Sequence, residues 1–291
     1  MSELNPRILQ GYGLIEAPID AVVKPFGTHK RADQAEMRVR TTTDSVQDAI
    51  AFLAVRTHPA THLVLVDMGP WTAVLTNQRS GSDFMDHRHW ATKAVGVRTI
   101  RVVDAKARWW TREALRERLG YEARMFEMHG PDGALIRSIA CADDGGRWVF
   151  ATSGEPFPIE ASFAYGALRK RDRFTSANLA DLMALVGPGV LTEDRFLNAS
   201  RYALLEERWK PDAWQKRILA AACTLEEADD PAYGYYERGL GRVPYMSSHY
   251  SSVIADFERA VAINPAYEPK VRDHLNTARR LAANAARTRA R

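Results

Sequence analysis

The sequence predicts an α+β protein, in which an amino-terminal mixed or antiparallel sheet with helices is followed by a carboxy-terminal helical segment. Over the first 190 residues, short apolar runs of strand length alternate with turn sequences rich in Gly, Pro and Asp. Beyond that point apolar residues recur at helical spacing, and a Pro-Ala-Tyr triplet occurs at Pro231 and again at Pro265. We therefore expect an α+β domain over residues 1–190 and a helical domain over residues 191–291.

Bulk composition sets limits on the class of protein. Of 291 residues, 46% are hydrophobic and 26% charged, which is typical of a folded soluble chain. The formal net charge of +4 is too small to indicate a nucleic-acid-binding protein on its own. The two cysteines cannot form a disulfide framework, and no apolar run has the length of a membrane span or a signal peptide. The composition predicts a cytoplasmic protein with no membrane part.

The elements of the first half follow from apolar periodicity and turn residues. MRVRTT (37–42) alternates as a half-buried strand does, and Asp44 or Ser45 can cap the amphipathic helix that follows. HLVLVDM (62–68) and WTAVLTN (71–77) flank a Gly-Pro turn and predict a hairpin. A polar loop, a short helix ending at Gly96 and a strand over 99–105 come next. This order predicts a sheet covered by helices on one face.

The sheet is expected to continue beyond residue 105. The turn sequences GPDG, DDGG and SGEP separate three apolar runs, because Pro sets φ, Gly permits positive φ and Asp accepts bonds from nearby backbone. The runs 123–128, 134–140 and 147–152 therefore predict an antiparallel meander. Thr175 or Ser176 then caps an amphipathic helix that stops at Gly187.

The segment GGRWVFATSGEPFPIE, with ALRKRDRFTSANLADLMALVG after it, resembles a segment of uncharacterised bacterial proteins. The resemblance covers about 40 residues and implies a bacterial source without implying an activity.

The carboxy-terminal third resembles tetratricopeptide repeats over about residues 200–267. The two Pro-Ala-Tyr triplets have the period of that repeat, and VIADFERAVAINPAY is similar to its second helix. The unit 234–267 departs from the pattern at Glu237 and Pro244, and the unit 200–233 has Glu206-Glu207 where Leu-Gly is usual. The resemblance implies antiparallel helix pairs closed by a helix over 268–286, with an unrelated helical bundle as the alternative.

Residues with metal-binding or catalytic chemistry were weighed against structural roles. His87 and His89 lie near Asp83 and Asp86, but residues two apart diverge by about 200° on a helix. His58 and His62 have zinc-like spacing, but Pro59 between them opposes a helix. Cys141 lies beside two acids, which raises the pKa of a thiol and lowers its reactivity. We expect no metal, no cofactor and no catalytic set.

Two regions are candidates for recognition of another protein. The polar loop 77–83 lies beside Trp71, and the residues Arg169 to Arg173 form the densest basic cluster. Helical repeats bind along the surface formed by their first helices. We expect these helices to carry Tyr and Arg side chains on that surface, together with Tyr202 and Glu206. The candidate binding residues are Trp71, Asn77, Arg79, Asp83, His87, Arg169, Arg171, Tyr235, Tyr236 and Arg238.

These observations favour a non-enzymatic protein-binding protein, such as an inhibitor or immunity protein or a regulatory adaptor, whose partner is another protein. Nucleic acid as a partner is less favoured. The alternative is an enzyme that acts on a phosphorylated or nucleic-acid substrate through Asp83–His89 and Arg169–Arg173.

Overall fold

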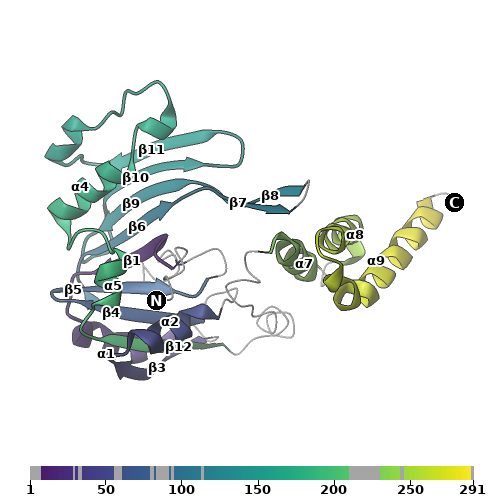
Figure 1. Cartoon of the computed structure of the whole chain (residues 1–291), viewed down its shortest axis with the longest axis horizontal. Helices are drawn as coiled ribbons and strands as arrows, with labels where there is room; N and C mark the ends of the chain where they lie inside the picture. The colour runs from purple at the N-terminus through teal and green to yellow at the C-terminus, as the bar shows by residue number, and fades with distance from the viewer. Residues whose placement is uncertain are drawn as a thin grey trace. The chain divides into compact units, whose positions relative to one another are not determined.

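The computed structural model describes residues 8–28, 30–31, 35–55, 61–78, 82, 92, 95–112, 115–209, 230–242 and 246–289. The chain forms two compact units (Figure 1). The sheet unit comprises Met1–Arg108 and Gly120–Lys210, and the helical unit comprises Trp109–Leu119 and Pro211–Arg291. Residues 191–210, which the sequence pattern assigns to the helical domain, thus belong to the sheet unit.

The sheet unit is built on a ten-stranded sheet in which every described pairing is antiparallel. Across the sheet the strands run β11-β10-β9-β6-β1-β5-β4-β12-β3-β2. Their bounds are β1 Gly11–Ile15, β2 Lys30–Arg31, β3 Ala35–Thr43, β4 His62–Met68, β5 Trp71–Thr76, β6 Thr99–Ala105, β9 Ala123–His129, β10 Leu135–Asp143, β11 Trp148–Gly154 and β12 Tyr202–Trp209. With its helices, this sheet confirms the α+β class.

Most elements of the sheet unit lie where local sequence predicts them. The expected strands correspond to β3, β4, β5 and β6, and the meander to β9, β10 and β11. Helix α2 (Val46–Ala54) begins after Ser45, whose hydroxyl accepts from the Asp48 N–H at 3.2 Å. Helix α4 (Ser176–Val186) begins after Thr175 and ends at Gly187, as expected. Turn and capping residues therefore locate these elements correctly.

Strand β1 and helix α1 (Ile19–Thr28) lie in a stretch for which the sequence predicts no element. All five residues of β1 are buried, and the strand lies in the middle of the sheet between β5 and β6. Gly11 is required there, because a Cβ atom at this position would lie 2.3 Å from the carbonyl oxygen of Ser82. Two glycines in five residues leave too little apolar pattern for a strand to be predicted.

Strand β12 corrects the prediction that Ser200–Tyr233 begins with a helix. Tyr202 and Glu206, expected on the binding face of a repeat helix, lie on a strand between β3 and β4. Tyr202 and Leu204 face one core of the sheet, whereas Ala203 and Leu205 face the other. A strand buried on both faces gives a continuous apolar run, which periodicity cannot distinguish from a buried helix.

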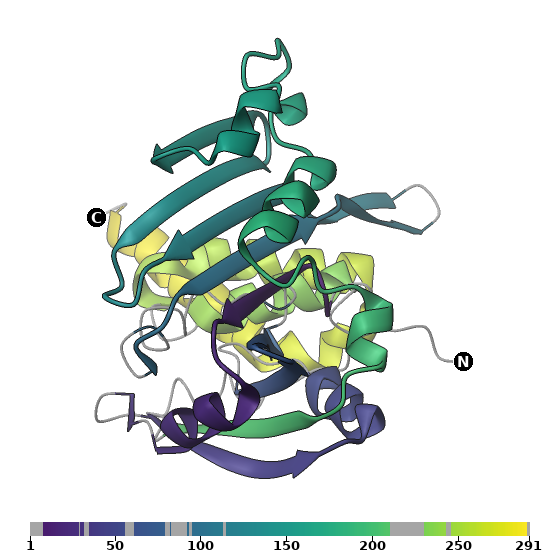
Figure 2. The same ribbon diagram turned by 90° about the vertical axis from the view of Figure 1, so that its left-hand side faces the viewer.

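Helices cover both faces of the sheet, not one face as the sequence predicts. One core contains side chains from α2, α4 and α5 (Glu193–Leu197) together with Val64 and Phe126 of the sheet. Figure 2 shows α4 in front of the strands. The second core contains Val22 and Phe26 of α1 against Leu63 and Leu65. Because neighbouring strand residues point to opposite faces, β4 contributes alternate residues to both cores.

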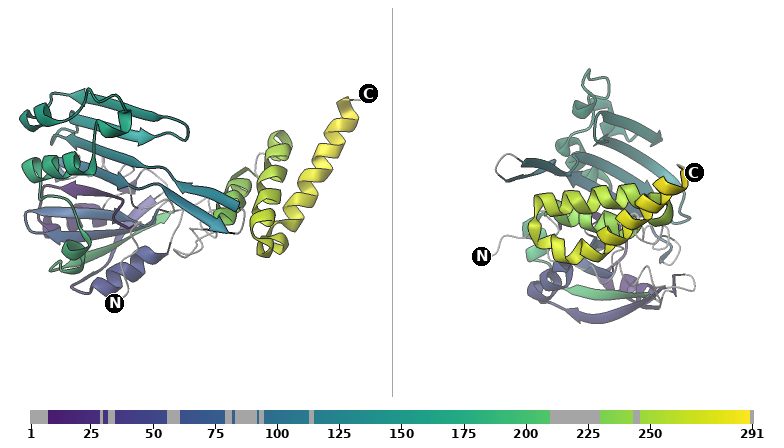
Figure 3. Two further views of the ribbon diagram at one scale, coloured as in Figure 1. Left: turned by 45° about the horizontal axis from the view of Figure 1, so that its top comes forward. Right: turned by 90° about the vertical axis from the view of Figure 1, so that its right-hand side faces the viewer.

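The helical unit contains α7 (Pro231–Arg242), α8 (Met246–Ile263), the 3-10 turn η5 (Pro265–Tyr267) and α9 (Glu268–Arg289). The three helices lie side by side (Figure 3). Asp230 and Asn264 precede equivalent triplets and are joined by a bond of 2.9 Å from Asn264 Nδ2 to Asp230 Oδ2. A Cβ atom at Gly239 would lie 2.5 Å from the Phe257 ring, so the absence of a side chain at Gly239 leaves room for this ring.

Two strands, β7 (Arg108–Arg112) and β8 (Leu115–Gly120), pair with each other in a separate two-stranded sheet. The likeness to tetratricopeptide repeats stays a prediction.

Candidate recognition surface

The basic loop, residues 164–173, brings an apolar side chain and several cations to the surface of the sheet unit. It follows the 3-10 turn η1 (Pro158–Ser162) and contains the 3-10 turn η2 (Lys170–Asp172). The Leu168 side chain is 97% exposed, which is far more than any other exposed large apolar residue of the described chain. Arg169, Lys170 and Arg171 follow it directly and are all exposed. The sequence prediction that Arg169 and Arg171 are accessible is therefore consistent with their placement.

A buried ion pair holds the base of the basic loop. Arg137 of β10 donates from Nε to Glu160 Oε1 at 2.9 Å, and the two side chains are only 4% and 1% exposed. Tyr165 donates its hydroxyl to Glu160 Oε2 at 2.6 Å, and the Phe157 N–H donates to Oε1 at 2.9 Å. Burial would raise the pKa of Glu160, but these donors and the charge of Arg137 bring it below its ordinary value. Glu160 therefore stays ionised and fixes both ends of η1.

The underside of the basic loop is packed against the sheet. Arg173 donates to the Ala167 carbonyl at 2.9 Å and lies over the Phe150 ring of β11 at 5.6 Å. Cys141 of β10 donates its thiol to the Lys170 carbonyl at 3.1 Å. Burial raises the pKa of the Cys141 thiol, which agrees with the expectation that it is unreactive. The loop is thus held from below while its tip stays accessible.

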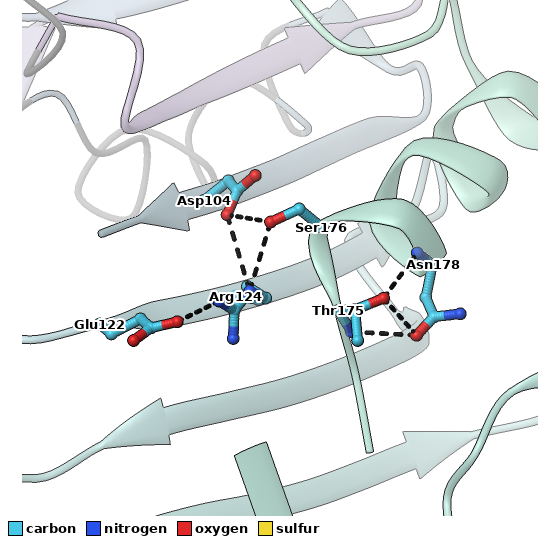
Figure 4. A network of polar contacts seen from close by, with 6 residues as sticks. All are labelled: Asp104, Glu122, Arg124, Thr175, Ser176 and Asn178. Carbon is cyan, nitrogen blue, oxygen red and sulfur yellow. Dashed lines mark hydrogen bonds and ion pairs between the residues drawn. The ribbon is translucent and has the colours of Figure 1, made fainter. Parts of the chain in front are cut away.

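A polar network joins β6, β9 and α4 beside the basic loop (Figure 4). Arg124 of β9 pairs with Glu122 and donates to Ser176 Oγ at 3.3 Å, and Ser176 donates to Asp104 Oδ1 at 2.9 Å. At the start of α4, Asn178 N donates to Thr175 Oγ1 at 3.2 Å and Thr175 N donates to Asn178 Oδ1 at 3.0 Å. These groups satisfy one another, so the network attaches α4 to the sheet. The sequence predicts the cap at Thr175 but not the contacts of Ser176 with Asp104 and Arg124, because these residues are far apart along the chain.

Trp71 and Asn77 were predicted to lie on a recognition edge, and this prediction is wrong because both side chains are buried. Trp71 is 7% exposed and belongs to the core beneath α2 and α4, and Asn77 is fully buried. Asn77 Oδ1 accepts the N–H groups of Thr61 and His62, each at 2.9 Å, while its Nδ2 donates to the Val55 carbonyl at 2.8 Å. A partner cannot reach either side chain. Asn77 joins the end of α2 to the start of β4.

Substitution Asn77→Ala is expected to destabilise the fold by about 3 kcal/mol, since it leaves buried backbone groups without their partner. Chemical denaturation monitored by circular dichroism measures the effect. The control Thr42→Ala, on the exposed surface of β3, should change the free energy of unfolding by less than about 0.5 kcal/mol. Equal stabilities for the two variants would contradict the structural role of Asn77.

The remaining members of the predicted edge, Arg79, Asp83 and His87, lie outside the described residues, as do Asp86 and His89. Their convergence with Arg171 on one pocket, which the enzyme hypothesis requires, therefore stays a hypothesis. His62, considered as a zinc ligand with His58, stacks on the Phe52 ring at 4.1 Å, and its Nδ1 lies 2.9 Å from the Phe52 carbonyl. His62 has a packing role in this position.

Tyr235, Tyr236 and Arg238 lie on α7, and their contacts are internal to the helical unit. Tyr236 is half-buried and packs against Tyr233, Phe257 and Tyr267, so it supports the helix core, and its role in binding stays a prediction. Arg238 donates from Nε to Asp256 Oδ1 at 2.9 Å and lies over the Tyr235 ring at 4.8 Å. Asp256 is 3% exposed, so this pair joins α7 to α8.

An open cleft of about 380 Å³ lies beside the turn between β4 and β5. It is lined by Asp67, Met68, Gly69, Asp194, Arg195, Asn198, Ala199 and Ser200. Asp67 accepts the Gly69 N–H and the Ser200 hydroxyl, each at 2.9 Å. Arg195 donates to the carbonyls of Pro188 and Val190. The side chains of Asp67 and Arg195 thus form hydrogen bonds that stabilise the turns around the cleft.

Within the part of the chain that the structure describes, no group of three or more His, Cys, Asp and Glu side chains could hold a metal ion. In the same residues, none of the helices combines the length and apolar character needed to cross a membrane. No family model, curated protein or solved structure matches the chain. The site must therefore be interpreted from its own chemistry.

Proposed function

We propose that this chain is a non-enzymatic protein-binding protein that recognises an acidic surface of another protein through the basic loop. The observation that carries the proposal is the tip of the basic loop, where Leu168 is 97% exposed and is followed directly by three exposed cations. Single exposed apolar side chains are common on protein surfaces, so the proposal rests on Leu168 together with the cations that follow it. An inhibitor, an immunity protein or a regulatory adaptor would all use such a surface.

The charges beside Leu168 define the partner. Arg169, Lys170 and Arg171 are all exposed, while Asp172 is the only acid among them and lies 3.6 Å from Arg171. Three cations around one apolar side chain suit an acidic rim around an apolar pocket, because Arg can donate bidentate bonds to carboxylates. A nucleic acid would be expected to need a longer basic surface, and the net charge of the chain is only +4.

The support beneath the basic loop adds to the argument. Arg137 and Glu160, both buried, and the half-buried Tyr165 hold its base through one hydrogen-bonded network. A loop that is already ordered loses less conformational entropy on binding, which strengthens association. A rigid base of this kind is consistent with a tip that keeps one conformation for binding.

Affinity purification from the native host tests the proposal with two triple variants. The loop variant carries Leu168→Ser, Arg169→Ser and Arg171→Ser, and the control carries Leu185→Ser, Arg40→Ser and Arg272→Ser at other exposed sites. We expect a protein that co-purifies with the wild type and the control but is reduced at least about tenfold with the loop variant, since exposed Leu and Arg anchors contribute more than about 1.4 kcal/mol together.

Recovery of the same partners by the loop variant and the wild type would show that the basic loop is not the binding surface. Loss of all partners after nuclease treatment, with release of nucleic acid, would replace the protein partner by a nucleic acid. Binding through this surface should also weaken as salt rises, because exposed charges are screened.

A further inference from the structure

The two edges of the ten-stranded sheet are protected to very different degrees. At one edge the described part of β2 consists of Lys30 and Arg31, which are both basic. Short edge strands and basic residues are two of the usual protections against edge pairing. At the other edge β11 has seven residues, WVFATSG, without a proline or a charge. Val149, Ala151, Thr152 and Ser153 are exposed along it. This is the kind of edge to which another strand can add.

The hairpin between β10 and β11 defines which backbone groups of β11 are available. The Asp144 N–H donates to the Arg147 carbonyl at 3.0 Å, and Ala142 is paired with Val149 and Ala140 with Ala151. Hydrogen-bonded and non-hydrogen-bonded pairs alternate in an antiparallel ladder. Val149, Ala151 and Ser153 therefore direct their backbone groups toward β10. Trp148, Phe150 and Thr152 direct theirs away from the sheet.

We propose that β11 is the site at which two copies of this chain pair, antiparallel and with Ala151 opposite Ala151 of the second copy. In this register Phe150 lies opposite Thr152 of the second copy, so the backbone groups that point outward meet one another. The aromatic and β-branched side chains of that pair also lie on the same face, which is a favourable cross-strand combination. Val149 lies opposite Ser153, and no bulky side chain lies on the two-fold axis.

Charge selects this register over its neighbours. Arg147 lies four residues before Ala151 and Glu155 lies four residues after it, and both are exposed. Arg147 also lies 3.3 Å from Asp144 in its own hairpin, where both side chains are exposed. Pairing about Ala151 brings Arg147 of each copy to Glu155 of the other. Pairing about Phe150 or Thr152 would also satisfy the backbone but would place Arg147 near Ser153 or Phe157. The paired charges and the alternating backbone groups thus favour the same two-fold arrangement.

Charge repulsion and a small buried area limit the affinity of this dimer. A two-fold axis perpendicular to the sheet keeps the same face on both copies, so the two basic loops come to lie on one face and repel each other. A single pair of edge strands also buries less than the roughly 1,600 Å² of a standard interface. We therefore expect a dissociation constant on the order of 10 µM, measurable by sedimentation velocity between low and high micromolar concentration.

Cysteine cross-linking tests the register. Opposed residues of a non-hydrogen-bonded pair have Cα atoms about 4.5 Å apart, which suits a disulfide. The variant Ala151→Cys should therefore form a disulfide-linked dimer under mild oxidation, identified by mass spectrometry of the linked peptide. Val149→Cys and Ser153→Cys are matched controls that should not cross-link alone, since each would lie about 13 Å from its own equivalent. Mixed together, those two controls should give the heterodimer.

Charge exchange tests the contact between the strand ends. Arg147→Glu and Glu155→Arg should each weaken the dimer roughly fivefold, and the double variant should restore the wild-type constant to within about twofold. A chain that stays monomeric up to several hundred micromolar would overturn the proposal and leave the β11 edge for a strand of another protein. A dimer in which Ala151→Cys fails to cross-link, or in which Val149→Cys cross-links alone, would overturn the register.

Discussion

Replacing Glu160 with alanine is expected to lower the free energy of unfolding by about 4 kcal/mol, because it leaves Arg137 as a buried charge without its carboxylate. It also removes the acceptor for the Tyr165 hydroxyl and the Phe157 N–H. The double variant Arg137→Met with Glu160→Leu should be less destabilised than Glu160→Ala, since it buries no unpaired charge. Urea unfolding of both variants measures the difference. The exposed pair between Glu268 and Arg272 on α9 supplies the control, and Glu268→Ala should cost less than about 0.5 kcal/mol.

The same carboxylate should make stability depend on pH in the acidic range. The folded-state pKa of Glu160 is lowered, so its contribution is complete above the unfolded-state pKa, about 4.3, and is lost as pH falls through the lower folded-state value. The wild type should therefore lose more stability than Glu160→Gln between pH 6 and pH 3. Parallel stability curves for the two proteins over this range would show that Glu160 does not carry this dependence.

Substitution Gly154→Ala at the end of β11 should be almost as damaging, with a loss of about 3 kcal/mol or more. Gly154 has a φ of +82°, and a Cβ atom on it would lie 2.0 Å from the Ile136 carbonyl oxygen, so the backbone of β10 or β11 must move. The register between β9 and β10 shifts between Leu135 and Arg137, at the same place. The glycine therefore accommodates a local irregularity of the sheet.

Two other glycines distinguish the two causes of the stability loss in Gly154→Ala, which are backbone strain and the close contact with Ile136. Gly133 has a φ of +82° but nothing within 4 Å of its would-be Cβ, so Gly133→Ala should cost about 1 kcal/mol from backbone strain alone. Gly146 has neither a positive φ nor a close neighbour, and Gly146→Ala should be neutral within about 0.5 kcal/mol. Thermal unfolding of the three variants measures this order. A Gly154→Ala protein as stable as Gly133→Ala would refute the close approach to Ile136.

The elements that depend on nearby residues were predicted from the sequence alone. β4, β6 and the meander follow from apolar runs bounded by turns, and α2 and α4 from the caps Ser45 and Thr175. Arg169 and Arg171 belong to a dense run of cations that the sequence predicts to be exposed, and both are exposed; their role in binding stays a prediction. In the helical unit, α9 lies where the closing helix over 268–286 was predicted, and its apolar residues Val271, Leu275 and Ala278 are buried at helical spacing. Each of these conclusions rests on interactions between residues close in the chain.

The tertiary structure decided everything that depends on which distant segments meet. β1 and β12 come from the beginning and the end of the sheet unit's sequence. The two glycines of β1 and the burial of β12 on both faces remove the alternation that marks a strand. Trp71 and Asn77 have the composition of a recognition edge but are buried. Trp71 packs in the core with α2 and α4, and Asn77 bonds to the backbone of Val55, Thr61 and His62. Glu160 meets Arg137 only because β10 and η1 pack together. Local sequence sets backbone preferences over a few residues, and it therefore predicted most elements of the sheet unit. Burial is set by the whole chain, so local sequence did not predict which elements lie next to one another.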